Sequence, residues 1–89
     1  MTSNELLLQY LKVDLGITTN KYDSRLTQYL ENAENEISRE GVTLADGDEQ
    51  LVIMYAAWTW RRRDSGEGMP RMLRYALNNR VFAGKMANG

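Results

Sequence analysis

The side chains best suited to specific binding chemistry are arginines in the last third of the chain. Arg61, Arg62 and Arg63 are consecutive. If they end a helix, they point about 100° apart and do not share one surface. Two interpretations remain open. The three cations complement the helix dipole, each by about 0.3–1 kcal/mol, or one or two of them meet carboxylates of a neighbouring subunit or line a channel.

A second basic cluster follows, and it includes an aromatic residue. Arg71, Arg74 and Asn78 fall at i, i+3 and i+7, so they share one face of a helix. Tyr75 lies beside them, and Arg80 lies at or just past the helix end. Because Arg and Tyr are favoured at interface hot spots, we expect a protein interface here rather than a solvated face. Direct contact with nucleic acid is the least favoured interpretation, because such surfaces usually belong to a more basic domain.

The composition excludes the commonest catalytic and metal-binding groups. The chain has no histidine and no cysteine, which rules out the usual zinc sites, Ser-His-Asp and Cys-His catalysis, and disulfides. Asp46, Asp48 and Glu49 form an acidic cluster without the ligand spacing of a calcium loop. Capping of a helix by Asp46 or Asp48 explains this cluster better. We therefore expect no enzyme activity, no cofactor and no metal.

The charge is unevenly distributed, although the net charge is only −1. Residues 1–60 carry four basic and ten acidic groups, a net charge of −6. Residues 61–89 carry seven basic and two acidic groups, a net charge of +5. This asymmetry predicts complementary surfaces if folding keeps the two charges apart. On the acidic side, Glu31, Glu34 and Glu36 are the candidates for a partner surface.

The chain has 89 residues and is expected to form one domain over 1–89, since either half would be too small for its own core. Apolar spacing predicts an all-α fold, a compact bundle of about four helices, over 4–15, 22–40, 48–63 and 70–80. Three of these helices show an apolar stripe. The stripes are Leu7, Leu8, Leu11 and Leu15, then Leu26, Leu30, Ala33 and Ile37, and last Met72, Leu73, Ala76 and Leu77.

Glycine and proline mark the expected helix ends. Gly16 and Gly41 are expected to end the first two helices. Residues 64–69 are expected to form a flexible loop, and Pro70 suits the first turn of the fourth helix. The small residues of 81–89 predict a loose C-terminal tail.

The third helix differs from the others, because every residue from Leu51 to Trp60 except Thr59 is apolar. A helix that is apolar on all sides must be surrounded. It is therefore either the central core helix or a helix that partly meets another subunit. Trp58 and Trp60 point to different sides, so one belongs to the core. The other lies either at a subunit boundary or in a second core position.

The same apolar run is too short to cross a membrane. It spans about 15 Å as a helix, roughly half of the length that a bilayer requires. The polar first residues also lack the pattern of a secretory leader. We therefore expect a soluble protein, made in the cytosol, with no membrane partner.

The order of these segments resembles the head–tail connector (adaptor) proteins of long-tailed phages and prophages, often described as DNA-packaging proteins. The resemblance covers most of the chain. It rests on Tyr10-Leu11-Lys12 and Leu15-Gly16-Ile17, on the spacing D-x-x-L-x-x-Y-L-x-x-A-x-x-x-I over 23–37, on the apolar run 51–58 before an arginine cluster, and on the segment 69–80.

This resemblance implies a structural virion protein at the head–tail junction, assembled in the cytoplasm of the bacterial host. The family implies a ring of about a dozen copies under the portal. Such a ring extends the DNA channel, completes the packaged head for tail attachment, and offers a platform to the next connector or stopper protein. Packaged DNA would pass through it without sequence-specific contact.

A ring requires that one surface of each copy meet a different surface of the next copy. Charge would set the register of that contact, and apolar groups near the third helix would supply most of the affinity. The candidates for contacts with other copies or with the portal are Trp58, Trp60, Arg61, Arg62, Arg63, Arg71, Arg74, Tyr75, Asn78 and Arg80.

An alternative function is that of a small helical DNA-binding regulator that uses the arginine-rich C-terminal half. Such a protein would bind duplex DNA with an affinity that falls steeply as salt rises.

Overall fold

Four segments with helical apolar spacing fold into four helices. The computed structural model describes residues 4–44, 47–66 and 68–88, and these residues contain no strand. The helices are α1 (Asn4–Leu15), α2 (Asp23–Arg39), α3 (Glu49–Ser65) and α4 (Arg71–Asn88). The predicted all-α bundle of four helices is therefore confirmed.

The stripes on α1 and α2 are buried much as their spacing predicts. On α2, the four residues from Leu26 to Ile37 that make up the stripe are at most 1 % exposed. Gly16 follows α1 with φ +72° and Gly41 follows α2 with φ +101°. Only glycine adopts such angles at little cost, and this is why the two helices end there. At the end of α3, Gly66 plays the same part, and its N–H donates to the carbonyl of Arg62 at 2.8 Å.

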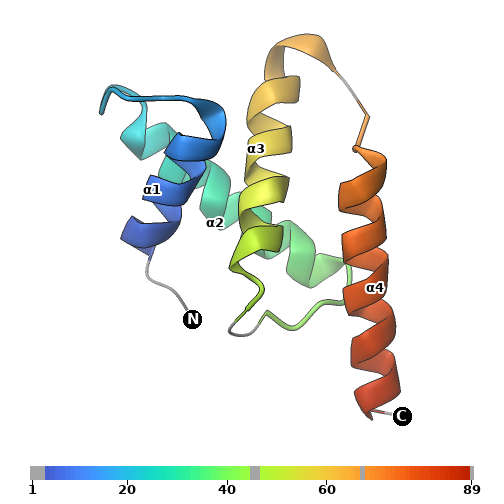
Figure 1. Ribbon diagram of the computed structural model, residues 1–89. Helices are drawn as coiled ribbons and strands as arrows, with labels where there is room; N and C mark the ends of the chain where they lie inside the picture. Colours follow the sequence, from blue (N-terminus) through green and yellow to red (C-terminus); the bar gives the residue numbers. More distant parts are fainter. Residues whose placement is uncertain (1–3, 45–46, 67, 89) are drawn as a thin grey trace.

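The helices form two thin layers, and α3 lies at their centre. In the view of Figure 1, α1 and α4 flank α3, while α2 crosses behind them. α3 contacts all three other helices, and α4 contacts chiefly α3. The Cα atoms extend over only 45 × 29 × 17 Å. In so flat a bundle, the outer faces of α1 and α4 are left without a covering helix.

The chain buries α3 by itself. From Leu51 to Trp60, every side chain is buried except Met54 and Thr59, which are half-buried. Of the two interpretations of this helix, the central core helix is therefore the one that the structure supports. No helix among the described residues is both long and apolar enough to cross a membrane.

A buried lysine fixes the turn between α1 and α2. Lys12 is only 6 % exposed. Its Nζ lies 2.9 Å from Asp23 Oδ1 and donates to Asn20 Oδ1 at 2.9 Å. A buried ammonium group is tolerated only with such partners. Lys12 thereby ties the end of the first helix to the start of the second.

The fourth helix is longer than the sequence predicts. Pro70 lies just before α4, and its carbonyl accepts the N–H of Arg74 at 3.0 Å. The helix continues to Asn88, so the end predicted at residue 80 is wrong. Ala, Lys and Met in residues 81–88 are good helix formers, and extending a helix costs much less than starting one. Beyond Phe82, which is 65 % exposed, the helix projects past the bundle (Figure 1).

The attachment of α4 gives a first prediction. Leu73 and Leu77 are at most 1 % exposed and anchor the helix. We expect Leu77→Ala to lower the free energy of unfolding by about 2–5 kcal/mol, because it leaves a cavity under α4. Tyr75→Ala, on the exposed side of the same helix, should change it by less than about 0.5 kcal/mol. Urea denaturation followed by circular dichroism measures both values, and equal losses would contradict this packing.

Candidate interaction surfaces

The three consecutive arginines at the end of α3 have three different partners within the chain. Arg61 Nη2 lies 3.5 Å from Asp14 Oδ2 and donates to the Asp14 carbonyl at 3.3 Å. The guanidinium group of Arg62 lies 4.6 Å from the centre of the Trp58 ring, and that of Arg63 lies 3.9 Å from the Trp60 ring. Such cation–π contacts stabilise by about 0.5–1 kcal/mol at exposed sites. The arginines thus do not share one surface, as predicted.

Both tryptophans belong to the core, on different sides of α3. Trp58 is 9 % exposed and Trp60 is 7 % exposed. Trp60 packs edge-to-face against Tyr29 of α2 at 5.3 Å. Trp58 packs edge-to-face against Tyr55 at 5.3 Å, and its Nε1 donates to the carbonyl of Gly68 at 3.1 Å. Both tryptophans therefore take core positions, which is one of the two alternatives that the sequence left open. Trp58 also binds the loop before α4.

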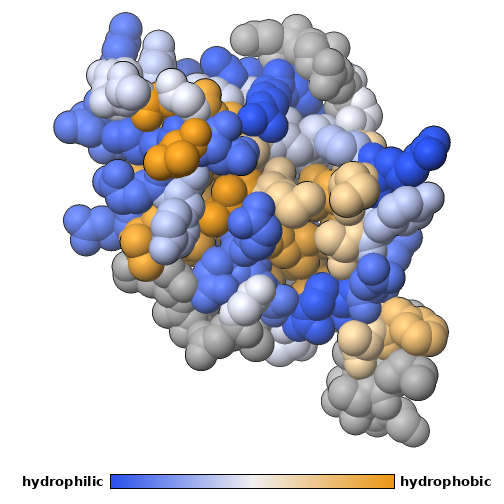
Figure 2. Space-filling model, viewed as in Figure 1, coloured by the Kyte–Doolittle hydropathy of each residue, from blue (hydrophilic) through white to orange (hydrophobic). Residues whose placement is uncertain are grey.

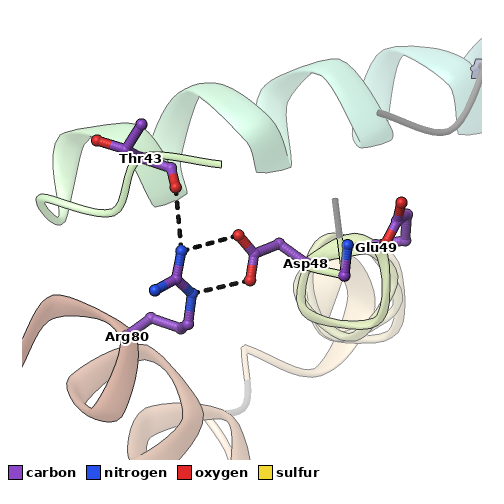
Figure 3. A network of polar contacts seen from close by, with 5 residues as sticks. Thr43, Asp48, Glu49 and Arg80 are labelled. Carbon is purple, nitrogen blue, oxygen red and sulfur yellow. Dashed lines mark hydrogen bonds and ion pairs between the residues drawn. The ribbon is translucent and has the colours of Figure 1, made fainter. Parts of the chain in front are cut away.

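A bidentate ion pair ties α4 to the start of α3 (Figure 3). Arg80 Nε donates to Asp48 Oδ1 at 2.8 Å, and Nη2 donates to Asp48 Oδ2 at 2.9 Å. Nη2 also donates to the Thr43 carbonyl at 3.1 Å. The hydrogen bonds and the charge of Asp48 raise the pKa of Arg80. Arg80 is thus a connection inside the chain, although the sequence proposed it for an interface.

The same pair corrects the expected helix cap. Asp48 occupies the N-cap position of α3, but its side chain makes no capping hydrogen bond. Its carboxylate binds Arg80 instead. The other candidate for the cap, Asp46, lies outside the described residues.

The acidic and basic parts of the sequence mingle in the folded chain. A third pair joins Arg74 Nη1 to Glu40 Oε2 at 3.6 Å, in addition to the pairs of Arg61 and Arg80 described above. Three arginines of residues 61–89 therefore pair with carboxylates of residues 1–60. The expectation that folding keeps the two charges on separate faces is wrong for these residues, because α3 and α4 pack against the acidic segments.

The three glutamates proposed as one partner surface are also separated. Glu36 pairs with Arg39 at 3.0 Å. Glu34 is half-buried, and it lines a different hollow from the one that Glu36 lines. Burial raises the pKa of Glu34, and the nearby charge of Glu31 raises it further. Residues two apart on a helix point about 200° from each other, which explains why Glu36 does not join the other two.

The outer face of α4 keeps most of the residues proposed for it. Arg71, Arg74, Tyr75 and Asn78 are all exposed on the helix, as expected. Sequence reasoning missed an apolar column beside them. Met72, expected to pack inward, is 73 % exposed, and Tyr75 is 55 % exposed. Together with Phe82, at i, i+3 and i+10, these two residues form what we call the α4 stripe.

A second exposed apolar column lies on α1. Leu6, Tyr10 and Val13 fall at i, i+4 and i+7 and are 43 %, 49 % and 79 % exposed; we call them the α1 stripe. The signal was present in the sequence, as a second column beside Leu7 and Leu11. Figure 2 shows apolar side chains on the surface over α1 and, separately, at the projecting end of α4.

A shallow groove of about 480 Å³ runs between α1 and the start of α3. We call it the α1–α3 groove. Part of the α1 stripe forms one wall, and acidic residues lie in its lining. The lining residues are Tyr10, Val13, Asp14, Glu49, Gln50 and Ile53.

Two further grooves flank α3. One, of about 300 Å³, lies between α3 and the start of α4 and includes Trp58 and Met72. The other, of about 590 Å³, lies between α2 and α3 and includes Tyr55 and Glu36. Burial, followed by the charges of Glu36 and Glu40, raises the pKa of Tyr55, so its hydroxyl stays protonated at neutral pH. In the part of the chain that the structure describes, no three acidic residues are grouped to hold a metal ion.

A scan of protein-family models found no match to this chain, and searches of curated proteins and of solved structures found none either.

The Arg80–Asp48 pair gives a second prediction. Removing the guanidinium group takes two hydrogen bonds from the carboxylate of Asp48, which is only 9 % exposed, so Arg80→Ala should lower the free energy of unfolding by about 1–3 kcal/mol. Arg71→Ala removes the same charge from an exposed position of the same helix and should cost less than about 0.5 kcal/mol. In a double-mutant cycle with Asp48→Asn, the two losses should be clearly less than additive. Additive losses would show that the pair contributes nothing.

The pKa of Glu34 gives a third prediction. Because this pKa is higher in the folded chain than the ordinary value of 4.5, the folded chain binds the proton more tightly. Stability therefore falls as the pH rises from about 4.5 through the folded pKa. Glu34→Gln should raise the melting temperature at pH 7, and the gain should vanish at about pH 3, well below the ordinary pKa of 4.5, where Glu34 is protonated in both states. The exposed Glu5→Gln serves as control, and a gain for Glu34→Gln that is the same at both pH values would contradict this origin.

Proposed function

We propose that this chain is a structural subunit of a phage or prophage head–tail connector, assembled as a ring under the portal. The first support is the resemblance of its segments to that family. The apolar run of the resemblance forms the central helix α3, and the spacing over 23–37 forms the buried stripe of α2. These motifs are packing patterns, so they support a shared architecture rather than a shared chemistry.

The observation that carries the proposal is the presence of two apolar stripes on different helices. The α1 stripe and the α4 stripe lie on helices that flank α3 (Figure 1). A subunit of a ring needs two different contact surfaces, one for each neighbour. Contiguous exposed apolar surface commonly marks sites of protein association. A monomer with a single exposed stripe would suit a symmetric dimer instead.

The basis of the proposed assembly differs from that expected from the sequence. Neither Trp58 nor Trp60 is left open for a neighbour, and three arginines are paired inside the chain. The affinity between copies would come instead from Tyr75 and its neighbours on α4 and from the exposed side of α1. Arg71, Arg74 and Asn78 are the polar residues of the original set that remain exposed beside these apolar groups.

The alternative, a DNA-binding regulator, receives less support from the geometry. It would use the arginines at the end of α3 and on α4 to bind phosphates. Arg61 and Arg80 already bind carboxylates, and Arg62 lies against Trp58.

The test of the proposed function is the binding of the chain to the portal. The purified chain is mixed with portal rings of the phage or prophage that encodes it, and the particles are imaged by electron microscopy. We expect an additional ring of density under the portal, of about a dozen copies, with portal rings alone as the control. A chain that stays monomeric and leaves the portal unchanged would overturn the proposal. Binding to duplex DNA that weakens steeply with salt would favour the regulator instead.

A further inference from the structure

The exposed face of α4 combines apolar and basic groups. The helix contains Arg71, Arg74, Arg80 and Lys85 and no acidic residue. Arg71 directly precedes Met72, and Arg74 directly precedes Tyr75. Because successive helical residues point about 100° apart, both arginines lie on the same side of the α4 stripe. Both are exposed, and Arg74 keeps 45 % of its side chain accessible despite its contact with Glu40. The face therefore offers an apolar ridge with positive charge along one edge.

The α1–α3 groove offers the reverse combination. Tyr10, Val13 and Ile53 provide apolar walls, and Asp14 and Glu49 add carboxylates to the same lining. Glu49 Oε2 accepts the N–H of Gly47 at 2.8 Å, which holds this carboxylate at the start of α3. The carboxylate of Asp14 stays 45 % exposed beside Arg61. Arg61 offsets part of the charge of Asp14, whereas Lys12, the one basic residue of α1, is buried in the turn to α2.

We infer that the α4 stripe of one copy docks into the α1–α3 groove of a second copy of this chain. The ridge of an exposed helix fits a groove between two helices. Arg71 and Arg74 then approach the carboxylates of Asp14 and Glu49. Complementary charge fixes the register of such a contact, and the apolar groups supply its affinity. The inference deepens the proposed function and rests on it for the closure of a ring.

Charge also excludes the symmetric arrangements. If two copies paired through α4 alone, Arg71 would approach its own counterpart, with no acid on either helix to compensate. If two copies paired through the groove alone, Asp14 and Glu49 would meet the same two carboxylates of the other copy, and Arg61, which already binds Asp14, would offset them only in part. Like charges in contact disfavour both arrangements. The contact is therefore head-to-tail, and a head-to-tail contact leaves one free surface at each end of any chain of copies until a ring closes.

Two variants, each blocking one surface, test this inference. Val13→Arg places a cation in the groove, where it repels the basic ridge, and leaves α4 intact. Tyr75→Glu places an acid in the α4 stripe, where it meets the acidic groove, and leaves α1 intact. Val13 and Tyr75 are 79 % and 55 % exposed, and Arg and Glu are good helix formers. Both variants should therefore fold, which circular dichroism verifies.

Sedimentation of the full chain at concentrations up to roughly 1 mM gives the expected results. The unaltered chain should form species larger than a dimer. Each variant alone should associate at least about tenfold more weakly. An equimolar mixture of the two variants should form dimers and nothing larger, because the intact α4 of one variant fits the intact groove of the other. Gln28→Arg and Gln28→Glu, at an exposed position of α2, carry the same introduced side chains and should assemble like the unaltered chain.

Three results would overturn the inference. They are a monomeric unaltered chain at the highest concentration, a Val13→Arg chain that still dimerises alone, and a mixture of variants that stays monomeric. The portal experiment separates these failures from a failure of the proposed function. If the unaltered chain adds a ring to the portal but Val13→Arg or Tyr75→Glu assembles normally, the proposed function stands and the inferred interface is wrong. If the chain assembles head-to-tail but does not bind the portal, the inferred interface stands and the proposed function is wrong.

Discussion

The fold depends on one constraint, which is that α3 is apolar on nearly all sides and only 89 residues are present to surround it. The chain meets this constraint with one helix behind α3 and one on each flank. Val52 and Ala56, both 0 % exposed, are small enough to let neighbouring helices approach closely. Each flanking helix turns its inner face to α3, and no other helix of the residues that the structure describes covers its outer face. The exposed apolar columns of α1 and α4 are thus a consequence of how few residues surround the centre.

Polar contacts hold this thin arrangement at the points where the chain turns. Lys12 binds across the first turn, and Arg80 binds the carboxylate at the start of α3 together with a carbonyl of the loop before it. Removing one partner of such a contact leaves the other desolvated, which costs more than the contact itself contributes. These residues therefore specify where the helices sit, while the leucines supply most of the free energy. Arg80, which the sequence analysis assigned to an interface, is used for this purpose inside the chain.

The helices could be predicted from the sequence because the information for them is local. The stripe of α2 repeats over about three turns, and Gly16 and Gly41 end helices through their own backbone preferences. The pairing of Arg80 with Asp48 could not be predicted, because it joins residues 32 positions apart whose proximity depends on the packing of whole helices. The extension of α4 was missed because, beyond Phe82, helix propensity rather than an apolar stripe continues it.

The faces of the helices were harder to assign than their extents. α4 has apolar residues at both Met72 and Leu73, and only one of these adjacent positions can face α3. Apolar character alone does not choose between two columns on one helix. The assignment depends on the position of Trp58 and of the loop carbonyl that its indole binds. For the same reason, the exposed apolar column of α1 could not be distinguished from the buried column that contains Leu7 and Leu11.

The placement of the two indoles has a spectroscopic consequence. Trp58 senses whether α4 and its preceding loop are docked, because its ring NH is bound to that loop. Trp60 lies among tyrosines of the opposite layer and senses the packing of α2. The chain thus carries two intrinsic fluorophores that report on different halves of the same molecule. A departure of the last helix would shift the emission of one fluorophore and leave the other unchanged.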